Sequence, residues 1–552
     1  MKKVLLIIFL IFLFKNLKSE IHSPYLLFPF SIPITQASLN GSNMSTWIWN
    51  TGVFNQDART LNTPGFEWPK GSGKFAIYSS GLSIGTYIND SLRLASISYN
   101  GEYAPGYINN HAGITNSLFK LYKISRGDNS SNNPDYANWG LMVPYGAPFV
   151  DVNNNNVFDP DVDKPGMRNA SQTIFICLTD AFPENHNIAE GFSGGTLPIF
   201  SEMHLTAWCY DTDTSLHKAQ FLKFAVINKN VSSWTKTYFG IVCDPDLGDK
   251  TDDYIGCDSV RSFGYCYNSD NQDGTGAGIT YGLSPPAVGV DLLKGAVDKS
   301  GPTPVDLKMT SFTYFTKPSE GGISCEQDPQ LPIEAYNYLR GLKKDSTRWV
   351  NARTGNLTKY CYNGDPEIGG GWTEFMGVIK NCGGTTTGNI NGSNPGDRRF
   401  VIGSGSSNLT VSPGDTQTFI ISQFAIRKSN NKNSVTWLKN LDDEIQNIYN
   451  SNFSVNVRSI SSSIPENFSL FQNYPNPFNP STKIKFEIAK SDFVNLTVFD
   501  LSGKVVEQLV NEKLNEGVYE VNFTSKNISS GIYFYRLSSS NFSQTNRMIL
   551  VK

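Results

Sequence analysis

Two acidic segments of this chain have residue types and spacings that suit a hard metal ion. In the first, Asp151, Asn153, Asn155 and Asp159 place oxygen side chains at relative positions 1, 3, 5 and 9, and Val157 offers a backbone carbonyl at position 7. Calcium takes six to eight oxygen ligands, and a tightly coiled loop turns alternate side chains toward one centre. The spacing therefore predicts a calcium loop.

This loop departs from the EF-hand pattern at two positions. Asn156 stands where glycine is usual, although Asn tolerates a left-handed backbone. Val162 stands where the last glutamate belongs, so Asp161 or Asp163 would supply that carboxylate. No flanking helices are predicted, and a loop with so few charges would bind weakly, at the affinity that extracellular calcium satisfies. The alternative is an Asn-rich turn without an ion.

The second segment carries six aspartates within fifteen residues: Asp244, Asp246, Asp249, Asp252, Asp253 and Asp258. Carboxylates at this density repel one another unless cations or hydrogen-bond donors compensate. We expect a second calcium site here, with a solvated acidic loop as the alternative. If the chain is an enzyme, this segment is where catalytic carboxylates would be sought.

Other catalytic patterns are weak. Residues 191–195 match G-x-S-x-G, but no strand–turn–helix pattern surrounds them. The five histidines form no H-E-x-x-H motif, and no C-x-x-C occurs. Trp47, Trp49 and Trp68 could stack on sugar rings, although a buried aromatic core is the favoured interpretation. We expect a non-enzymatic protein with a role in adhesion, glycan binding or extracellular structure, and a secreted hydrolase of polysaccharide or protein is the alternative.

Composition narrows the possible partners. Lys and Arg number 46 against 49 Asp and Glu, a net charge of −3, which argues against a broad basic surface for nucleic acid. The eight cysteines permit up to four disulfides in an exported protein. Short loops favour Cys243–Cys257 or Cys361–Cys382.

The first residues predict export. Lys2 and Lys3 precede an apolar run from Val4 to Phe14, and a small residue follows at Ser19. This pattern is typical of a signal peptide over residues 1–19. The apolar run is shorter than the roughly 20 residues that span a bilayer, so no transmembrane anchor is expected.

The 552 residues suggest about three or four units, mostly β with few helices. Region 20–180 carries the first calcium loop, and region 181–455 carries the acidic segment and the cysteines. Alternation at Leu222, Phe224 and Val226 and the run 174–178 predict strands. Residues 332–340 and 434–449 predict helices. The expected body is a β-sandwich of two or three units.

Residues 456–467 are rich in serine and predict a linker. The following region, 468–552, alternates apolar and polar residues over several short runs, which predicts a small Ig-like β-sandwich. Its opening is rich in proline, and its distinctive residues are Asn473, Tyr474, Pro475, Asn476, Pro477, Phe478, Asn479, Pro480, Gly503, Gly517, Gly531, Tyr533 and Lys552.

These residues resemble the type A C-terminal sorting domain of the type IX secretion system, and the region is also similar to the FlgD-type Ig-like domain. The resemblance implies translocation across the outer membrane by the secretion machinery. It also implies removal of the domain and either attachment to the cell surface or release. Segments 65–71, 244–248 and 394–400 resemble uncharacterised extracellular proteins with the same domain, which adds a secreted role and no activity.

Overall fold

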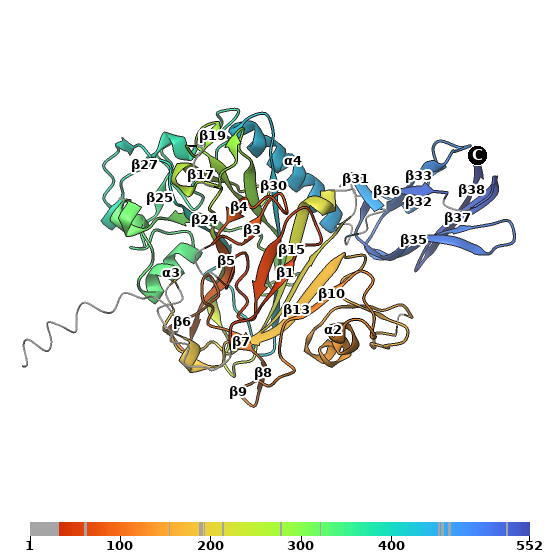
Figure 1. The fold of residues 1–552 in the computed structure, drawn as a ribbon, viewed down its shortest axis with the longest axis horizontal. Coiled ribbons are helices and arrows are strands. Elements are labelled where there is room, and N and C mark those ends of the chain that lie inside the picture. The colour runs from red at the N-terminus through yellow and green to blue at the C-terminus, as the bar shows by residue number, and fades with distance from the viewer. Residues whose placement is uncertain are drawn as a thin grey trace, which may run out of the picture.

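The computed structural model describes residues 33–59, 63–153, 155–186, 191–192, 194–211, 215–275, 279–320, 322–450, 453, 457–461, 465–525 and 528–551. The predicted signal peptide and Lys552 lie outside these ranges. The chain is mostly β with few helices, as its alternating apolar pattern predicts. Figure 1 shows a large body and, beside it, a smaller C-terminal unit.

Two antiparallel sheets build the body. The larger has the order β10 (Tyr122–Ser125), β13 (Gln172–Thr179), β14 (Ser201–Cys209), β15 (Ala219–Asn228), β30 (Thr416–Ile426), β21 (Ala287–Lys294), β18 (Phe263–Asn268) and β17 (Asp253–Asp258), and β7 (Ala104–Pro105) also pairs with β13. The smaller has the order β24 (Ser311–Phe315), β29 (Arg399–Gly405), β16 (Thr235–Asp244), β5 (Ser79–Ile88) and β6 (Ser91–Ser96).

Two-stranded ribbons occupy many of the connections. They are β1 (Gln36–Leu39) with β2 (Thr46–Trp49), β3 (Phe66–Glu67) with β4 (Phe75–Ile77), β8 (Tyr107–Asn109) with β9 (Ala112–Ile114), β11 (Phe149–Val150) with β12 (Lys164–Pro165), β19 (Gln272–Asp273) with β20 (Gly282–Leu283), β22 (Val297–Asp298) with β23 (Val305–Asp306), β25 (Trp349–Val350) with β26 (Leu357–Thr358), and β27 (Val378–Ile379) with β28 (Ile390–Asn391).

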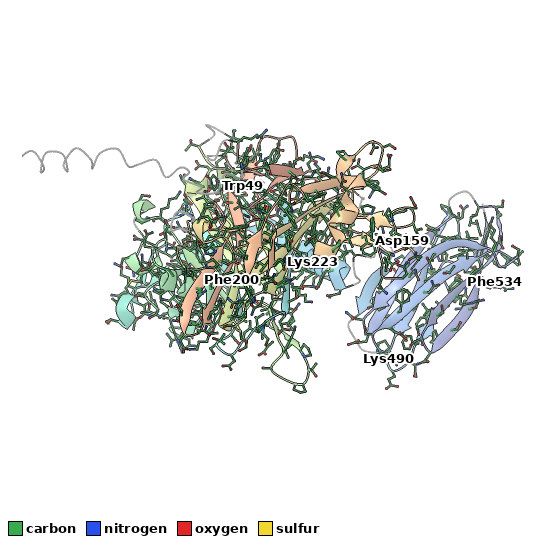
Figure 2. All side chains as sticks on the ribbon, turned by 90° about the horizontal axis from the view of Figure 1, so that it is seen from below. Trp49, Asp159, Phe200, Lys223, Lys490 and Phe534 are labelled. Atoms are coloured by element: carbon green, nitrogen blue, oxygen red, sulfur yellow. A yellow bond between two sulfur atoms is a disulfide. The ribbon has the colours of Figure 1, made fainter. Side chains whose placement is uncertain are left out.

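The two sheets share one hydrophobic core. Leu222, Phe224 and Val226 of β15 are fully buried in it, together with Ile241 of β16 and Ile402 of β29. The predicted regions 20–180 and 181–455 meet in this core, because β13 and β14 are hydrogen-bonded neighbours on either side of the predicted boundary. Both regions therefore contribute to the same sandwich, which Figure 2 shows filled with side chains around Trp49.

Helix α4 (Asn431–Asn450) covers the outer face of the larger sheet, as the apolar face predicted over 434–449 requires. Leu438 and Leu441 pack there against Phe221, Phe263 and Phe424, which point away from the sandwich core. These strands are thus apolar on both faces. A continuous run of apolar residues therefore predicts them better than an alternating pattern does.

Helix α3 (Pro332–Leu339) lies on the smaller sheet and confirms the helix predicted over 332–340. It approaches the sheet at two glycines. A Cβ on Gly85 would lie 2.7 Å from the Tyr336 ring, and one on Gly240 would lie 2.5 Å from Leu339. Only residues without a side chain allow this helix to pack so closely. The third helix of the described chain, α2 (Pro134–Ala137), is a single turn.

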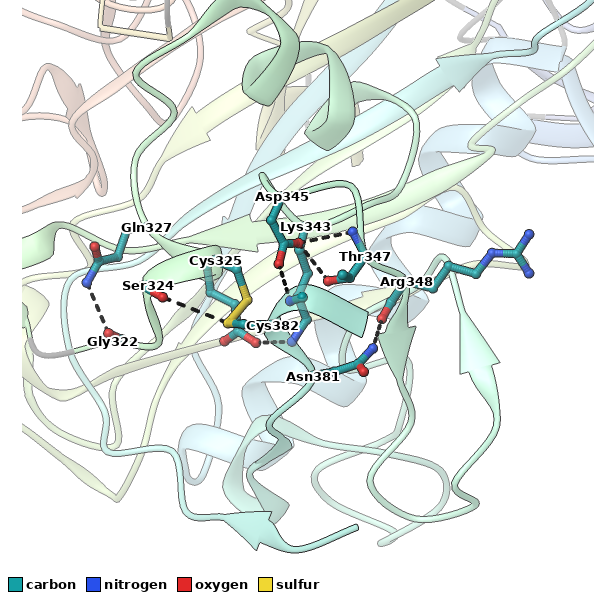
Figure 3. The surroundings of a disulfide bond; sticks show 12 residues. Gly322, Ser324, Cys325, Gln327, Lys343, Asp345, Thr347, Arg348, Asn381 and Cys382 are labelled. Atoms are coloured by element: carbon teal, nitrogen blue, oxygen red, sulfur yellow. Dashed lines mark hydrogen bonds and ion pairs between the residues drawn. A yellow bond between two sulfur atoms is a disulfide. The ribbon is translucent and has the colours of Figure 1, made fainter. Parts of the chain in front are cut away.

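The cysteines pair differently from the prediction. Cys325 and Cys382 form a disulfide, and Figure 3 shows it beside Asp345 and Asn381. The other six cysteines are buried and unpaired: Cys177, Cys209, Cys243, Cys257, Cys266 and Cys361. The predicted pairs Cys243–Cys257 and Cys361–Cys382 are therefore wrong. Cys243 and Cys257 lie on strands of different sheets, which short sequence separation cannot reveal.

The C-terminal unit consists of two four-stranded antiparallel sheets. One has the order β31 (Val457–Ser461), β36 (Gly517–Thr524), β33 (Ser481–Ile488) and β32 (Ser469–Leu470), and the other has the order β35 (Val505–Leu514), β34 (Asp492–Phe499), β37 (Gly531–Ser539) and β38 (Phe542–Leu550). Its own core contains the predicted alternating residues: Ile484, Phe486, Ile488, Val494, Leu496, Val498, Tyr519, Val521 and Phe523.

The predicted linker 456–467 needs a correction. Residues 457–461 form β31, which pairs with β36 at the edge of a sheet. A Ser-rich segment can satisfy its backbone in an edge strand even though its composition suits a linker. The C-terminal unit therefore includes residues before the predicted boundary at 468.

Candidate functional site

A buried acidic group lies where two central strands of the smaller sheet meet. Strand β16 ends at Asp244, and β29 begins at Arg399, just after Asp397. Cys243 pairs with Phe400 across these strands, so Asp244 and Asp397 come together although 153 residues separate them. One ligand oxygen from each of Asp244, Asp246 and Asp397 lies within 4.8 Å of the others. Asp397 was missed in the sequence because it stands alone, far from the other aspartates.

Three cations face this acidic group. The Arg399 Nε lies 3.4 Å from Asp244 Oδ2, and its Nη2 lies 3.6 Å from Asp397 Oδ1. The Nζ atoms of Lys317 and Lys250 lie 3.0 Å and 3.2 Å from Asp397 Oδ2. Burial alone would raise the pKa of Asp397, but the three cations outweigh it and hold the pKa below its ordinary value.

The other two aspartates of the group have pKa values above the ordinary value. Burial raises the pKa of Asp244, although Arg399 and a hydrogen bond from the Tyr99 hydroxyl at 2.8 Å oppose it. Burial, and next the charge of Asp244, raise the pKa of Asp246 well above its ordinary value. Among the described residues, the buried oxygens Asp244 Oδ1 and Asp397 Oδ1 have no hydrogen-bond partner. Such oxygens can accept a proton or bind a cation.

The rest of the predicted acidic segment does not join this group. Asp249 and Asp252 lie beside Asp273: the Asp249 N–H donates to Asp273 Oδ1 at 2.8 Å, and the Gly274 N–H donates to Asp252 Oδ2 at 2.7 Å. Burial, together with the neighbouring aspartates, raises the pKa of Asp252 to about 6 despite that hydrogen bond. This loop is a second, more exposed acidic cluster.

Strand β17 separates the last two predicted ligands. Asp253 begins the strand and accepts the Leu247 N–H at 3.0 Å. Asp258 ends it, about 17 Å away at strand spacing, where it binds Arg261 at 2.8 Å. The six aspartates therefore cannot surround one ion, because an extended strand carries the last of them away.

The loop 151–163 brings its predicted oxygens together, with Asn154 outside the described residues. The Nδ2 atoms of Asn153 and Asn155 donate to Asp159 Oδ2 at 2.8 Å and 2.7 Å. Asp151 accepts the Asn156 N–H at 2.7 Å, and Asp163 accepts the Asp159 N–H at 2.8 Å.

Asn156 has the left-handed backbone, φ 60°, that its position in the loop predicts. The side-chain amide nitrogens of Asn153 and Asn155 point toward Asp159. Cation binding would require both amides to rotate so that their oxygens face the ion. Figure 2 marks Asp159 on this exposed loop.

The tryptophans form no stacking platform. Trp49 and Trp68 are buried in the core, and Trp47 is half-buried with the Arg59 guanidinium 4.7 Å from its ring centroid. The favoured interpretation of these residues as core is correct.

The proline-rich motif of the C-terminal unit lies along its last strand. The Phe478 N–H donates to the Ile549 carbonyl at 2.9 Å, and Asn476 Oδ1 accepts the Ile549 N–H at 2.9 Å. Asn473 is buried, and its Nδ2 donates to the Pro475 carbonyl and to Thr482 Oγ1. The motif thus forms hydrogen bonds with β38 without being a strand of the sheet.

The remaining motif residues have local roles. Phe478 fills the core, whereas Tyr474 is 80% exposed. Asn479 and Pro480 lead into β33, Gly503 adopts φ 81° in the turn after β34, and Gly517 and Gly531 begin β36 and β37. The Tyr533 hydroxyl donates to the Ser529 carbonyl at 2.7 Å.

Residues 472–552 match the family of secretion system C-terminal sorting domains. No curated protein matches the chain. The solved structures with distant similarity include a polysaccharide lyase and PorZ. A polysaccharide lyase has 8% identity and a TM-score of 0.16 over 63% of this chain and 34% of that one. PorZ, a surface component of the type IX secretion system of Porphyromonas gingivalis, has 10% identity and a TM-score of 0.13 over 94% and 75%.

The chain spans about a third of the length of the polysaccharide lyase. Both TM-scores are below 0.5, so neither similarity supports a shared activity. The sorting domain does place the protein among those exported to the cell surface or secreted, and it implies an interaction with the secretion machinery. Within the described residues, no helix has the length and apolar character that a bilayer span requires.

Proposed function

We propose that this exported protein, which carries a type IX secretion sorting domain, is a non-enzymatic component of the cell surface or of the secreted material. Its body would serve adhesion, glycan binding or extracellular structure, and calcium would stabilise it. The predicted signal peptide over residues 1–19 would direct the first step of export. The two-sheet C-terminal unit supports an Ig-like assignment for the sorting domain.

The observation that carries the non-enzymatic proposal is the burial of the best carboxylate group. Asp244, Asp246 and Asp397 are only 4%, 8% and 2% exposed. Lys250, Lys317 and Arg399 stand around the group. A glycosidase must bring two carboxyl groups to either side of a bound sugar. A polymer has little access to carboxylates enclosed in this way, so the group suits the fold better than catalysis.

Calcium is proposed at two places. In the buried group, two carboxylate oxygens that accept no hydrogen bond and the nearby Asp246 offer hard ligands. In the loop 151–163, rotation of the amides of Asn153 and Asn155 would add two oxygens to those of Asp151, Asp159 and Asp163. A millimolar extracellular supply would suffice for weak sites of this kind.

A glycan and polysaccharide binding screen of the whole protein tests this function, run with calcium and again with EDTA. We expect binding without release of reducing sugar. Loss of binding in EDTA would show that glycan binding depends on calcium. Cleavage of any polysaccharide or protein in the same screen would contradict a non-enzymatic role.

One observation favours the alternative, a hydrolase. The pKa of Asp246 is raised while that of Asp397 is lowered, and opposite shifts are typical of an acid and base pair. If a hydrolytic activity is found, Asp246→Asn and Asp397→Asn should each abolish it while the circular dichroism spectrum stays native. Asp258→Asn, at the far end of β17, is the matched control and should leave activity unchanged.

A further inference from the structure

Three metal-ligating side chains share one face of the larger sheet, away from the acidic group. Cys177 of β13 lies directly opposite His204 of β14 in the antiparallel register. Glu202 precedes His204 by two residues, so it points to the same face of the sheet. One ligand atom from each of the three lies within 4.8 Å of the others. Two residues of one strand and one residue of its neighbour thus come together through strand pairing alone.

The sheet and its surroundings hold these side chains in place. Glu202 Oε2 accepts the Ile108 N–H at 2.9 Å, which leaves Oε1 directed at His204 Nε2, 3.1 Å away. Lys229 Nζ lies 3.6 Å from the same Oε1. The Glu202 carboxyl group is thus in contact with the Ile108 N–H, the His204 ring and the Lys229 ammonium group.

The cysteine lies in an apolar setting, and its thiol is 3.2 Å from the Gly106 carbonyl oxygen. Cys177 is only 1% exposed, so reagents in solvent have little access to its thiol. The His204 Nε2 faces Glu202. Activated cysteine chemistry is therefore disfavoured, whereas a metal ion would compensate the charge of a thiolate at this position.

A glycine allows the backbone to pack closely against the histidine ring. Gly146 adopts φ 90°, and a Cβ at this position would lie 2.1 Å from His204 Nδ1. The His204 side chain is 14% exposed, whereas Cys177 is 1% and Glu202 is 4% exposed. The three ligands are thus nearly enclosed, with His204 on the side nearest solvent.

We propose that Cys177, Glu202 and His204 form a zinc site. Sulfur and imidazole nitrogen beside one carboxylate suit zinc and not calcium, which prefers oxygen ligands only. Zinc bonds of 2.0–2.3 Å in a tetrahedron set ligand atoms roughly 3.5 Å apart. The three ligand atoms now lie within 4.8 Å of one another, so small side-chain movements would complete the site. Three protein ligands leave a fourth position for water or another ligand.

The proton balance of binding is defined. The Cys177 thiol loses its proton to solvent and binds zinc as thiolate, so one proton is released for each ion bound. The hydrogen that His204 Nε2 shares with the Glu202 carboxylate must leave Nε2, because that nitrogen binds zinc through its lone pair; in the neutral ring it moves to Nδ1 by exchange with solvent, with no net release. The Glu202 carboxylate then binds the ion through Oε1 and keeps its hydrogen bond from Ile108.

Zinc binding to the purified whole protein tests the site. After chelator treatment, zinc or cobalt is titrated and metal content is measured by mass spectrometry. We expect one bound zinc, and a cobalt complex with the ultraviolet charge-transfer band of a thiolate ligand. An excess of calcium should not displace the ion. Two results would overturn the proposal: a zinc content no higher than that of a heat-denatured sample, or a cobalt complex without the thiolate band.

Variants locate the ion. Cys177→Ser and His204→Gln should each weaken zinc binding by roughly 100-fold or more, and Cys177→Ser should remove the thiolate band. The matched control is Cys209→Ser, an equally buried cysteine of β14 outside the group, which should bind zinc as the wild type does. His204 is partly exposed, so His204→Gln keeps the test decisive if Cys177→Ser misfolds. Unchanged affinity in His204→Gln would refute the site.

Asp246→Asn separates this site from the proposed calcium group. It should leave zinc binding unchanged, because Asp246 belongs to the other sheet's acidic group. Zinc binding that falls with Asp246→Asn and not with His204→Gln would place the ion at the aspartates and contradict the proposal.

Discussion

The two acidic regions of this protein look alike in sequence and differ in structure. The loop 151–163 is local and exposed, and its own backbone and amide groups satisfy Asp151, Asp159 and Asp163. The group of Asp244, Asp246 and Asp397 is buried, is assembled from distant segments, and contains carboxylate oxygens that accept no hydrogen bond within the described residues. Spacing along the chain predicts the first acidic region, whereas burial decides how strongly the charges of the second region interact.

The largest expected difference follows from removing one buried charge. Asp397→Ala leaves Arg399 buried, and Lys250 and Lys317 without their shared partner, which should destabilise the body by about 3 kcal/mol. Urea unfolding followed by tryptophan fluorescence measures this.

The control is an exposed ion pair. Arg126 and Asp211 lie 2.6 Å apart with side chains about half exposed, so Asp211→Ala should cost less than about 0.5 kcal/mol. Equal losses in the two variants would show that burial does not set the strength of the acidic group.

The second prediction concerns calcium. At 100 times its dissociation constant, a ligand that binds only the folded state stabilises it by about 2.7 kcal/mol. Calcium should therefore raise the melting temperature of the wild type by several degrees over EDTA, and Asp246→Asn should remove most of that shift. An equal melt in calcium and EDTA would exclude a structural calcium ion in both acidic regions.

A third prediction uses a carboxyl group on the buried face of α4. Burial raises the pKa of Asp442 to about 8, next to the buried carboxyl of Asp291 on β21, with Arg261 and Asp443 nearby. Because the folded state holds this proton more tightly than the unfolded chain, stability should fall as the pH rises from about 4 through about 8.

Asp442→Asn cannot ionise, so it should be more stable than the wild type at pH 9, by about 2 kcal/mol or more, with the difference vanishing below about pH 4. Chemical unfolding at several pH values measures it. A wild-type advantage at pH 9 would mean that Asp442 is charged and well compensated in the folded state.

The smallest expected effect is in the exposed loop. Asn156 has a left-handed backbone, so Asn156→Gly should change stability by less than about 0.5 kcal/mol, whereas Asn156→Ala should cost about 1 kcal/mol. Thermal melts of the two variants compare them. A loss from Asn156→Gly as large as that from Asn156→Ala would point to a role for the Asn side chain itself.

Local patterns predicted most of the elements correctly. The alternation of Ile484, Phe486 and Ile488 identified a strand of the C-terminal core, and the apolar face of 434–449 identified α4. The strand β31 was missed because composition alone suggests a linker. The disulfide was mispaired because the fold, and not sequence separation, brings Cys325 to Cys382.

The candidate sites also differ in whether local sequence or strand pairing forms them. The predicted residues of the loop 151–163 lie close together because neighbours in sequence form it, and calcium binding there stays a prediction. Asp258 was wrongly grouped with Asp244, because β17 extends between its neighbours and carries it away. Asp397 and the cluster of Cys177, Glu202 and His204 were missed, because each depends on which strands pair.

The sequence by itself determined the β architecture, the two candidate helices of the body, the sorting domain and therefore export. These depend on periodicity and on motifs that neighbouring residues carry. The tertiary structure alone decided which carboxylates share a buried environment, which cysteines meet, and which face of β14 carries ligands. Strand pairing joins residues more than a hundred positions apart, and burial then sets their charge and their ability to bind an ion.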